Sequence, residues 1–139
     1  MVGIILITHG NLGDEFIKVS GKIYGALKQV YSVAILPDEG KSIVMDKLKE
    51  TFSKADTGDG VLLLTDGFGG SPSNLCLNFL KESHCEIVTG LNLSMLLEVL
   101  CYQDQLVLKE LAARAEAGGK RGIVYASELL RQKLNSATS

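Results

Sequence analysis

One histidine, His9, stands where a side chain could carry out chemistry. It directly follows an apolar run over residues 2–7 and, through Gly10, leads into a turn. Such a run is typical of a buried parallel strand, so Thr8 and His9 would lie at its carboxyl end. In open α/β sheets this end is where ligands bind. A nucleophilic imidazole there needs a group that orients it and a pocket that holds an anion.

Asp66 is the candidate for the orienting group. It follows a second fully apolar run, residues 61–64. A carboxylate that accepts the N–H of one ring nitrogen fixes the tautomer and leaves a lone pair on the other nitrogen. It also stabilises the imidazolium-like state that forms when that nitrogen attacks an electrophile. The simpler alternative is that Asp66 only forms an Asx turn.

The turn after Asp66 is rich in glycine and could form the anion pocket. Its backbone can approach a ligand closely, with amides turned toward it, at Gly67, Gly69 and Gly70. Ser71 adds a hydroxyl donor, and the helix predicted to begin at Ser71-Pro72 adds free N–H groups. We expect Thr8, Gly69, Gly70 and Ser71 to bind phosphate, although such a turn is often only a tight connection. The set would suit a phosphoryl group travelling on or off His9.

The remaining chain alternates strands and helices. Strands are predicted over residues 2–8, 30–36, 61–64 and 86–90. Helices are predicted over the repeat from Leu12 to Leu27, around Val44 to Phe52, from Ser71 to Leu80, from a cap at Ser94, and over Gln105 to Ala117 with an end at Gly118-Gly119. Gly122 to Ala126 could form a last short strand before a frayed helical tail.

These βα units predict an α/β fold: a doubly wound three-layer sandwich with a mostly parallel sheet and helices on both faces. The predicted strand order is 2-1-3-4, so the first and third strands are neighbours. His9 and Asp66 would then face each other across the crevice at their carboxyl ends. With 139 residues and no visible linker, we expect a single domain over residues 1–139.

Composition narrows the function classes. The formal charge of −2 and a pI near 5.7 give no electrostatic footprint for nucleic acid. Apolar stretches are too short to span a bilayer, and the first residues do not read as a signal peptide, so a cytoplasmic protein is expected. The first strand is not followed by a dinucleotide motif and the turn is not a P-loop, so we expect no such cofactor.

The cysteines and the second histidine give little indication of a metal site. Three cysteines, Cys76, Cys85 and Cys101, form no C-x-x-C pair and are expected to be reduced, partly buried thiols. His84 precedes the fourth strand, at the opposite edge of the sheet from His9, and is expected at the surface or in packing. A metal pair of His84 with Cys85 is the weaker alternative, so no metal site is predicted.

Three motifs in order carry a family resemblance. They are Thr8-His9-Gly10, then Asp66-x-x-Gly69-Gly70-Ser71-Pro72-x-Asn74, then the segment Gly90 to Leu96. Together they resemble the EIIA domain of the mannose family of the bacterial sugar phosphotransferase system, over almost the whole chain. The pairing of the first two motifs is specific, whereas either alone would not be. Position 67 departs from the family, which often has a larger residue than glycine there.

The resemblance implies a cytoplasmic phosphocarrier and phosphotransferase. His9 would take a phosphoryl group from phospho-HPr and pass it to an EIIB protein for carbohydrate uptake and phosphorylation, with Asp66 orienting the imidazole. No EIIB domain follows, so we expect EIIB to be a separate chain and the membrane to be reached only through the permease components. The family also implies a homodimer that exchanges a C-terminal strand, for which Gly122 to Ala126 is the candidate, with the apolar helix after Ser94 as a candidate interface.

Other functions remain open at this point. The phosphocarrier subunit of dihydroxyacetone kinase shares the fold, but typically carries Ser after the histidine, where this chain has Gly10. A regulatory EIIA without a transport role and a module that only binds are also compatible. A histidine phosphatase would need Arg where Thr8 stands, and a metal chelatase would need a second active histidine, for which only His84 remains.

Overall fold

The computed structural model describes residues 1–67, 77, 79–81 and 83–138. Within this part of the chain, parallel strands form one sheet in the order β2-β1-β3-β4, as predicted. The strands are β1 (Gly3–His9), β2 (Val30–Ile35), β3 (Val61–Thr65) and β4 (Cys85–Thr89). β1 and β3 are adjacent, so the residues that follow them meet at one edge of the sheet.

The two central strands, β1 and β3, are covered on both faces, and this burial matches their apolar sequences. Every residue of β3 is buried, and β1 is buried up to its last residue, His9. Strands covered on both faces need side chains that are apolar without alternation, which is the pattern of residues 2–7 and 61–64. The register places Ile7 beside Thr65 and His9 beside Ile35, so His9 is the last paired residue of its strand.

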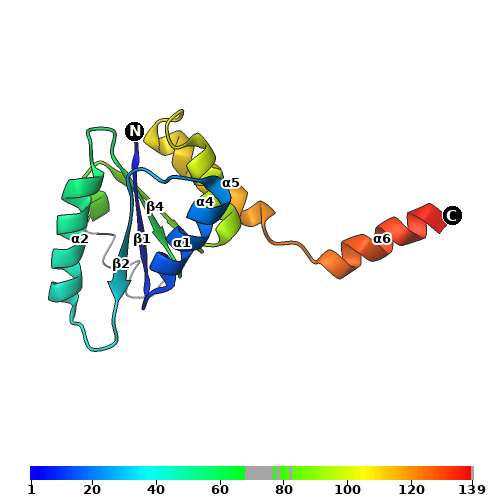
Figure 1. The fold of residues 1–139 in the computed structure, drawn as a ribbon, viewed down its shortest axis with the longest axis horizontal. Helices are drawn as coiled ribbons and strands as arrows, with labels where there is room; N and C mark the ends of the chain where they lie inside the picture. Colours follow the sequence, from blue (N-terminus) through cyan, green and yellow to red (C-terminus); the bar gives the residue numbers. More distant parts are fainter. Residues whose placement is uncertain (68–76, 78, 82, 139) are drawn as a thin grey trace.

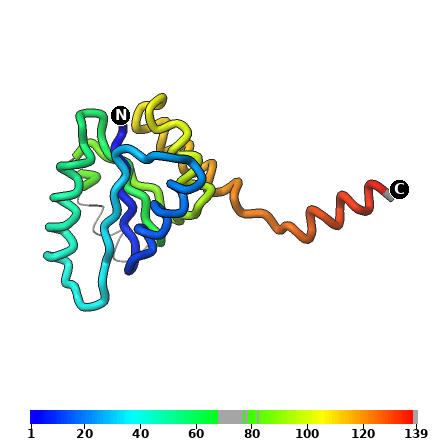
Figure 2. The backbone as a smooth tube through the Cα atoms, in the orientation of Figure 1, coloured from blue at the N-terminus to red at the C-terminus, as the bar shows by residue number. Residues whose placement is uncertain are grey.

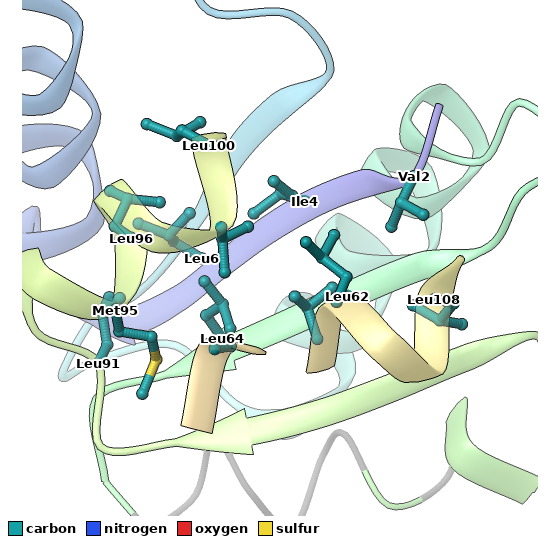
Figure 3. Packing of buried hydrophobic residues seen from close by; sticks show 13 residues of the cluster. Val2, Ile4, Leu6, Leu62, Leu64, Leu91, Met95, Leu96, Leu100 and Leu108 are labelled. Atoms are coloured by element: carbon teal, nitrogen blue, oxygen red, sulfur yellow. The ribbon is translucent and has the colours of Figure 1, made fainter. Parts of the chain in front are cut away.

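Helices cover both faces of the sheet, which confirms the three-layer architecture (Figure 1). One face is covered by α1 (Leu12–Tyr24), α4 (Leu93–Tyr102) and α5 (Leu108–Arg121), and the other by α2 (Lys41–Ala55). Figure 3 shows alternate residues of the two central strands, Ile4, Leu6, Leu62 and Leu64, packed against side chains of α4 and α5. The intervening residues pack on α2 and Phe79.

The boundaries of α4 and α5 correct two predictions. The cap of α4 is Asn92, whose side chain accepts from the Met95 N–H at 2.8 Å, and not Ser94. α5 does not end at Gly118-Gly119 but continues to Arg121. Both glycines are buried against α4, where a Cβ at Gly118 would lie 2.7 Å from the Cβ of Glu98. These glycines therefore allow two helices to pack closely and do not terminate one.

The most deeply buried residues of α1 are small, and Phe16 and Ile17 beside them pack against the core while partly buried. An apolar face normally faces the core, yet Leu12, Val19 and Ile23 are exposed, whereas Gly13 and Ser20 are buried. A Cβ at Gly13 would lie 3.1 Å from the Cβ of Ser32 in β2, so the helix rests close to the sheet. The apolar repeat is thus displaced to the flank of the helix, and α1 ends at Tyr24, before the predicted Leu27.

The predicted helical tail is confirmed, whereas the strand that residues 122–126 would lend to a second copy stays a prediction. Residues 122–125 form no strand within this single chain, and the tail is a 13-residue helix, α6 (Ala126–Thr138). This C-terminal arm, residues 122–138, extends away from the rest of the molecule (Figures 1 and 2). Its apolar side chains are exposed: Ile123, Val124, Tyr125, Leu129, Leu130 and Leu134. In the described residues, no helix has both the length and the apolar character needed to cross a membrane.

Candidate active site

His9 and Asp66 meet at the carboxyl ends of β1 and β3. The Nδ1 atom of His9 lies 3.0 Å from the Oδ2 atom of Asp66, and the same oxygen accepts the backbone N–H of His9 at 3.0 Å. An ionised carboxylate can only accept hydrogen bonds, so a neutral imidazole in this contact carries its proton on Nδ1. The lone pair then lies on Nε2, the nitrogen that Asp66 does not contact.

The two side chains differ in their access to solvent. The His9 side chain is 66% exposed, whereas that of Asp66 is 12% exposed. The Oδ1 atom of Asp66 is buried and accepts no hydrogen bond from the described residues, so its contacts there all run through Oδ2. A mostly shielded carboxylate thus holds an imidazole whose other nitrogen is open to a large reactant, including a protein.

The backbone around His9 is fixed on both sides. Gly10 has a φ of +55°, a left-handed conformation that glycine adopts without steric cost, and its N–H donates to the Ile35 carbonyl at 2.9 Å. Thr8 is fully buried, and its Oγ1 accepts the Gly13 N–H at 2.8 Å. Thr8 therefore ties the first turn of α1 to the strand end. The hydroxyl of Thr8 contacts α1, and the role of Thr8 in binding phosphate stays a prediction.

Sequence reasoning missed Gly13 as part of this arrangement. Its backbone N–H is the donor to Thr8, and its lack of a side chain lets α1 approach β1 and β2. The adjacent Asp14 accepts a hydrogen bond from Ser32 of β2, which anchors the helix a second time. A hydroxyl five residues before a glycine at a strand-to-helix turn was the available signal, but this spacing has no strong helix-cap signature.

The predicted anion pocket lies mostly outside the described residues. This applies to Gly69, Gly70 and Ser71, and to the helix start at Ser71-Pro72. Gly67 is described, and its carbonyl accepts from the Thr65 hydroxyl at 3.4 Å. Residues 77 and 79–81 are helical, with Phe79 buried on Phe52. The pocket itself remains a prediction.

Comparison with known proteins agrees with the resemblance. The model of the family EIIA-man, described as PTS system fructose IIA component, matches residues 3–116. The mannose-specific EIIAB component of Escherichia coli K12 is 31% identical over 124 residues, 88% of this chain and 38% of the relative. The chain thus spans well under half of that relative. The fructose-specific EIIA component of Bacillus subtilis is 29% identical, covering 95% of this chain and 91% of the relative.

This chain belongs to the EIIA-man family. Its fold agrees with solved members: phosphotransferase system component EIIA from Streptococcus agalactiae superposes with a TM-score of 0.84 at 25% identity, covering 92% of this chain and 99% of that one. The mannose/sorbose specific IIA subunit from Enterococcus faecalis gives 0.79 at 26% identity, covering 88% and 92%. Membership places the chain among the IIA components of the phosphotransferase system.

The second histidine of this EIIA chain lies apart from the first. His84 immediately precedes β4, is exposed, and its carbonyl accepts from Val61 at the start of β3. This places it at the amino edge of the sheet, as predicted. Among the described residues, no group of three or more His, Cys, Asp or Glu could hold a metal ion.

The described cysteines of this EIIA chain have contrasting environments. Cys85 is buried, and burial raises the pKa of its thiol to about 11. Such a thiol stays protonated and inert at neutral pH. Cys101 is exposed, which corrects the expectation of partly buried thiols, because it lies on the outer side of α4. Cys76 lies outside the described residues.

Proposed function

We propose that this chain is a phosphocarrier in which His9 takes a phosphoryl group from phospho-HPr and passes it to an EIIB protein. The observation that carries the proposal is the contact between His9 Nδ1 and Asp66 Oδ2, 3.0 Å long, on a ring that is 66% exposed. A nucleophile that serves a small substrate would be expected inside a pocket. An exposed, oriented imidazole suits exchange between two protein surfaces.

The proposed transfer moves one phosphoryl group between two imidazoles. The lone pair of His9 Nε2 attacks the phosphorus of the donor phosphohistidine, a new N–P bond forms, and the donor N–P bond breaks. The electron pair of the broken bond returns to the donor ring nitrogen. No water or metal enters the balance. The reverse sequence on an EIIB protein then restores His9.

Asp66 has two tasks in this step. Before transfer, its Oδ2 holds the proton on Nδ1 and keeps the lone pair on Nε2. After transfer, the ring carries a phosphoryl group on Nε2 and a proton on Nδ1, and is therefore cationic. The adjacent carboxylate stabilises that positive charge, as the carboxylate of a catalytic triad does. Thr8, Gly69, Gly70 and Ser71 stay the candidates for holding the phosphoryl oxygens.

The test is phosphorylation in a reconstituted relay. The chain is incubated with phosphoenolpyruvate, Enzyme I and HPr, and its intact mass is measured. We expect the mass of one phosphoryl group to be added to the wild type and to the matched control His84→Ala, but not to His9→Ala. Unchanged wild-type mass, or label that survives in His9→Ala, would overturn the proposal.

The acceptor separates the transport role from its alternatives. Discharge of the phosphorylated chain is measured with an EIIB of the mannose family and, in parallel, with the dihydroxyacetone kinase partner. We expect rapid discharge to EIIB. Discharge only to the kinase would assign the chain to that assembly, and discharge to neither would favour a regulatory role.

The domain and its oligomeric state are also proposals. We infer that residues 1–139 form one EIIA domain that is a homodimer, in which each copy lends residues 122–126 to the other. β4 is an edge strand, and beside it lies a groove of about 760 Å³ lined by side chains of β4 and α5, including Ile87, Val88, Ala112 and Ala113. Within the described residues the outer edge of β4 has no strand partner, and both such an edge and an exposed apolar arm favour cover by another chain.

A proline in the arm tests the exchange. Proline cannot donate to a strand ladder, so Val124→Pro should shift the protein toward the monomer in light scattering after size exclusion. Val124→Thr keeps a β-branched side chain and should stay dimeric. A wild type that is monomeric at micromolar concentration, or a dimer that Val124→Pro leaves intact, would contradict the strand exchange.

A further inference from the structure

We propose that the exposed apolar flank of α1 is the docking surface for the protein that exchanges a phosphoryl group with His9, an inference that rests on the proposed function. The α1 stripe consists of Leu12, Phe16, Val19 and Ile23, spaced by four, three and four residues. This spacing places all four side chains on one line along a helix. The partner chemistry that fits is a folded phosphohistidine protein with apolar side chains around its own histidine.

Three members of the stripe are open to solvent. Leu12 is 44% exposed, Val19 41% and Ile23 59%, while Phe16 is half-buried and packs against the core. The charged residues of the helix lie elsewhere on its surface, where Lys18 and Glu15 pair with each other. The helix meets the core through other residues, because Gly13 and Ser20 are buried and Phe16 and Ile17 pack against the core cluster. Exposed apolar side chains of Leu12, Val19 and Ile23 that core packing does not use are suited to a partner.

The stripe starts beside the nucleophile. Leu12 follows His9 by three residues, and the Thr8 hydroxyl holds the first turn of α1 against the strand end. From Leu12 to Ile23 a helix rises about 16 Å. A standard protein interface buries about 800 Å² on each partner, a patch with a radius of roughly 16 Å. A partner centred on His9 would therefore cover Leu12 and extend along the helix toward Val19, with Ile23 at or beyond its rim.

This geometry predicts a gradient that other occupants would not produce. Truncation at Leu12 should weaken docking most and truncation at Ile23 least, because contacts near the centre of an interface carry most of its energy. If a second copy of this chain bound the stripe instead, the loss of binding on truncation would not depend on distance from His9. The truncations would then change the oligomeric state. The two occupants are therefore separable in one set of variants.

The experiment measures the rate of transfer from phospho-HPr by rapid quench over a range of HPr concentrations. We expect Leu12→Ala to raise the half-saturating concentration about fivefold or more, Val19→Ala less, and Ile23→Ala least. The limiting rate should not change, because the imidazole and Asp66 are untouched. Lys22→Ala controls for a change on α1 away from the stripe, and Val107→Ala controls for loss of an apolar side chain at the amino edge.

The outcomes separate this inference from the proposed function. Equal half-saturation in the wild type and all three stripe variants, with normal phosphorylation of His9, would overturn the docking surface and leave the phosphocarrier intact. If the stripe variants have a lower mass in solution than the wild-type dimer, the stripe contacts a second copy of the chain. That result would also overturn the docking surface. If the wild type takes no phosphoryl group, the proposed function fails; NMR titration with unphosphorylated HPr then decides docking, and unchanged α1 signals would overturn it.

Discussion

The two edges of the sheet carry the same residue types for different purposes. At the carboxyl edge, Asp66 is only 12% exposed and contacts the imidazole of His9. At the amino edge, Asp59 is 60% exposed and pairs with the N-terminal ammonium of Met1, which holds the pKa of that carboxyl below its usual value. His84 lies near, but its ring makes no hydrogen bond within the described residues. Only one edge thus orients a histidine.

The amino edge is organised to close the fold. Gln103 is buried at the end of α4 and donates from Nε2 to the carbonyls of Val2 and Lys28, both at 2.9 Å. One amide thereby joins a helix to the start of β1 and to the segment before β2. Of the two aspartates that lie near a histidine, only Asp66, the less exposed one, contacts the ring, and this contact makes His9 the candidate nucleophile. Changes at the two edges should therefore affect different measurements.

The largest expected effect separates the two aspartates. Asp66→Asn should slow phosphorylation of His9 about a hundredfold or more, because the amide can present its N–H to Nδ1 and favour the wrong tautomer. Asp59→Asn should leave the rate unchanged. Rapid-quench transfer from phospho-HPr measures both. Equal rates for the two variants would remove the functional distinction between the edges.

The amino edge should instead respond in stability. Gln103→Met keeps a similar volume but deletes the donor to two carbonyls, so we expect about 2 kcal/mol less free energy of unfolding in urea titrations. Gln105→Met, on an exposed neighbour, should change it by less than about 0.5 kcal/mol. Transfer to folded Gln103→Met should proceed at the wild-type rate. A slowed transfer would show that the edges are coupled.

The smallest expected change in stability concerns Gly13, on the buried face of α1. Gly13→Ala should cost about 1 kcal/mol, since crowding against Ser32 and the Thr8 Oγ1, at 3.1 and 3.2 Å, outweighs the gain in helix propensity. Gly21→Ala meets nothing within 4 Å and should be neutral or stabilising. Chemical denaturation of both variants checks the pair. A stabilised Gly13→Ala would mean that α1 can shift outward freely.

Continuous apolar runs and strand order made much of this predictable. β1 and β3 are recognisable because strands buried on both faces admit no polar residue before their ends, and the first polar residues there are Thr8, His9 and Thr65, Asp66. The parallel order then places His9 beside Asp66. The pairing through Nδ1, and so the freedom of Nε2, could not be read from the sequence, because it depends on how the strand ends are offset.

The errors share a physical origin in packing between elements. Gly118-Gly119 is a helix-stop signal in isolation, but here it lets α5 approach α4. Asn92 outcompetes Ser94 as cap because it also donates to the Gly119 carbonyl at 3.0 Å, so one side chain serves two helices. The exposure of the apolar repeat of α1 could not be predicted, because the spacing of apolar residues does not indicate which neighbour they face. Such choices are made by tertiary partners that local patterns do not encode.

The hydrogen bond from Gly13 to Thr8 has a thermodynamic consequence. It joins the helix that bears the α1 stripe to the strand that bears His9 through a fully buried hydroxyl, which holds the first turn of the helix against the strand end. A partner that docks on the helix would meet an imidazole whose conformational freedom was already lost when the chain folded. Ordering entropy is then absent from the encounter. Successive partners could therefore bind and dissociate rapidly without a rearrangement of the helix, the strand end or the imidazole.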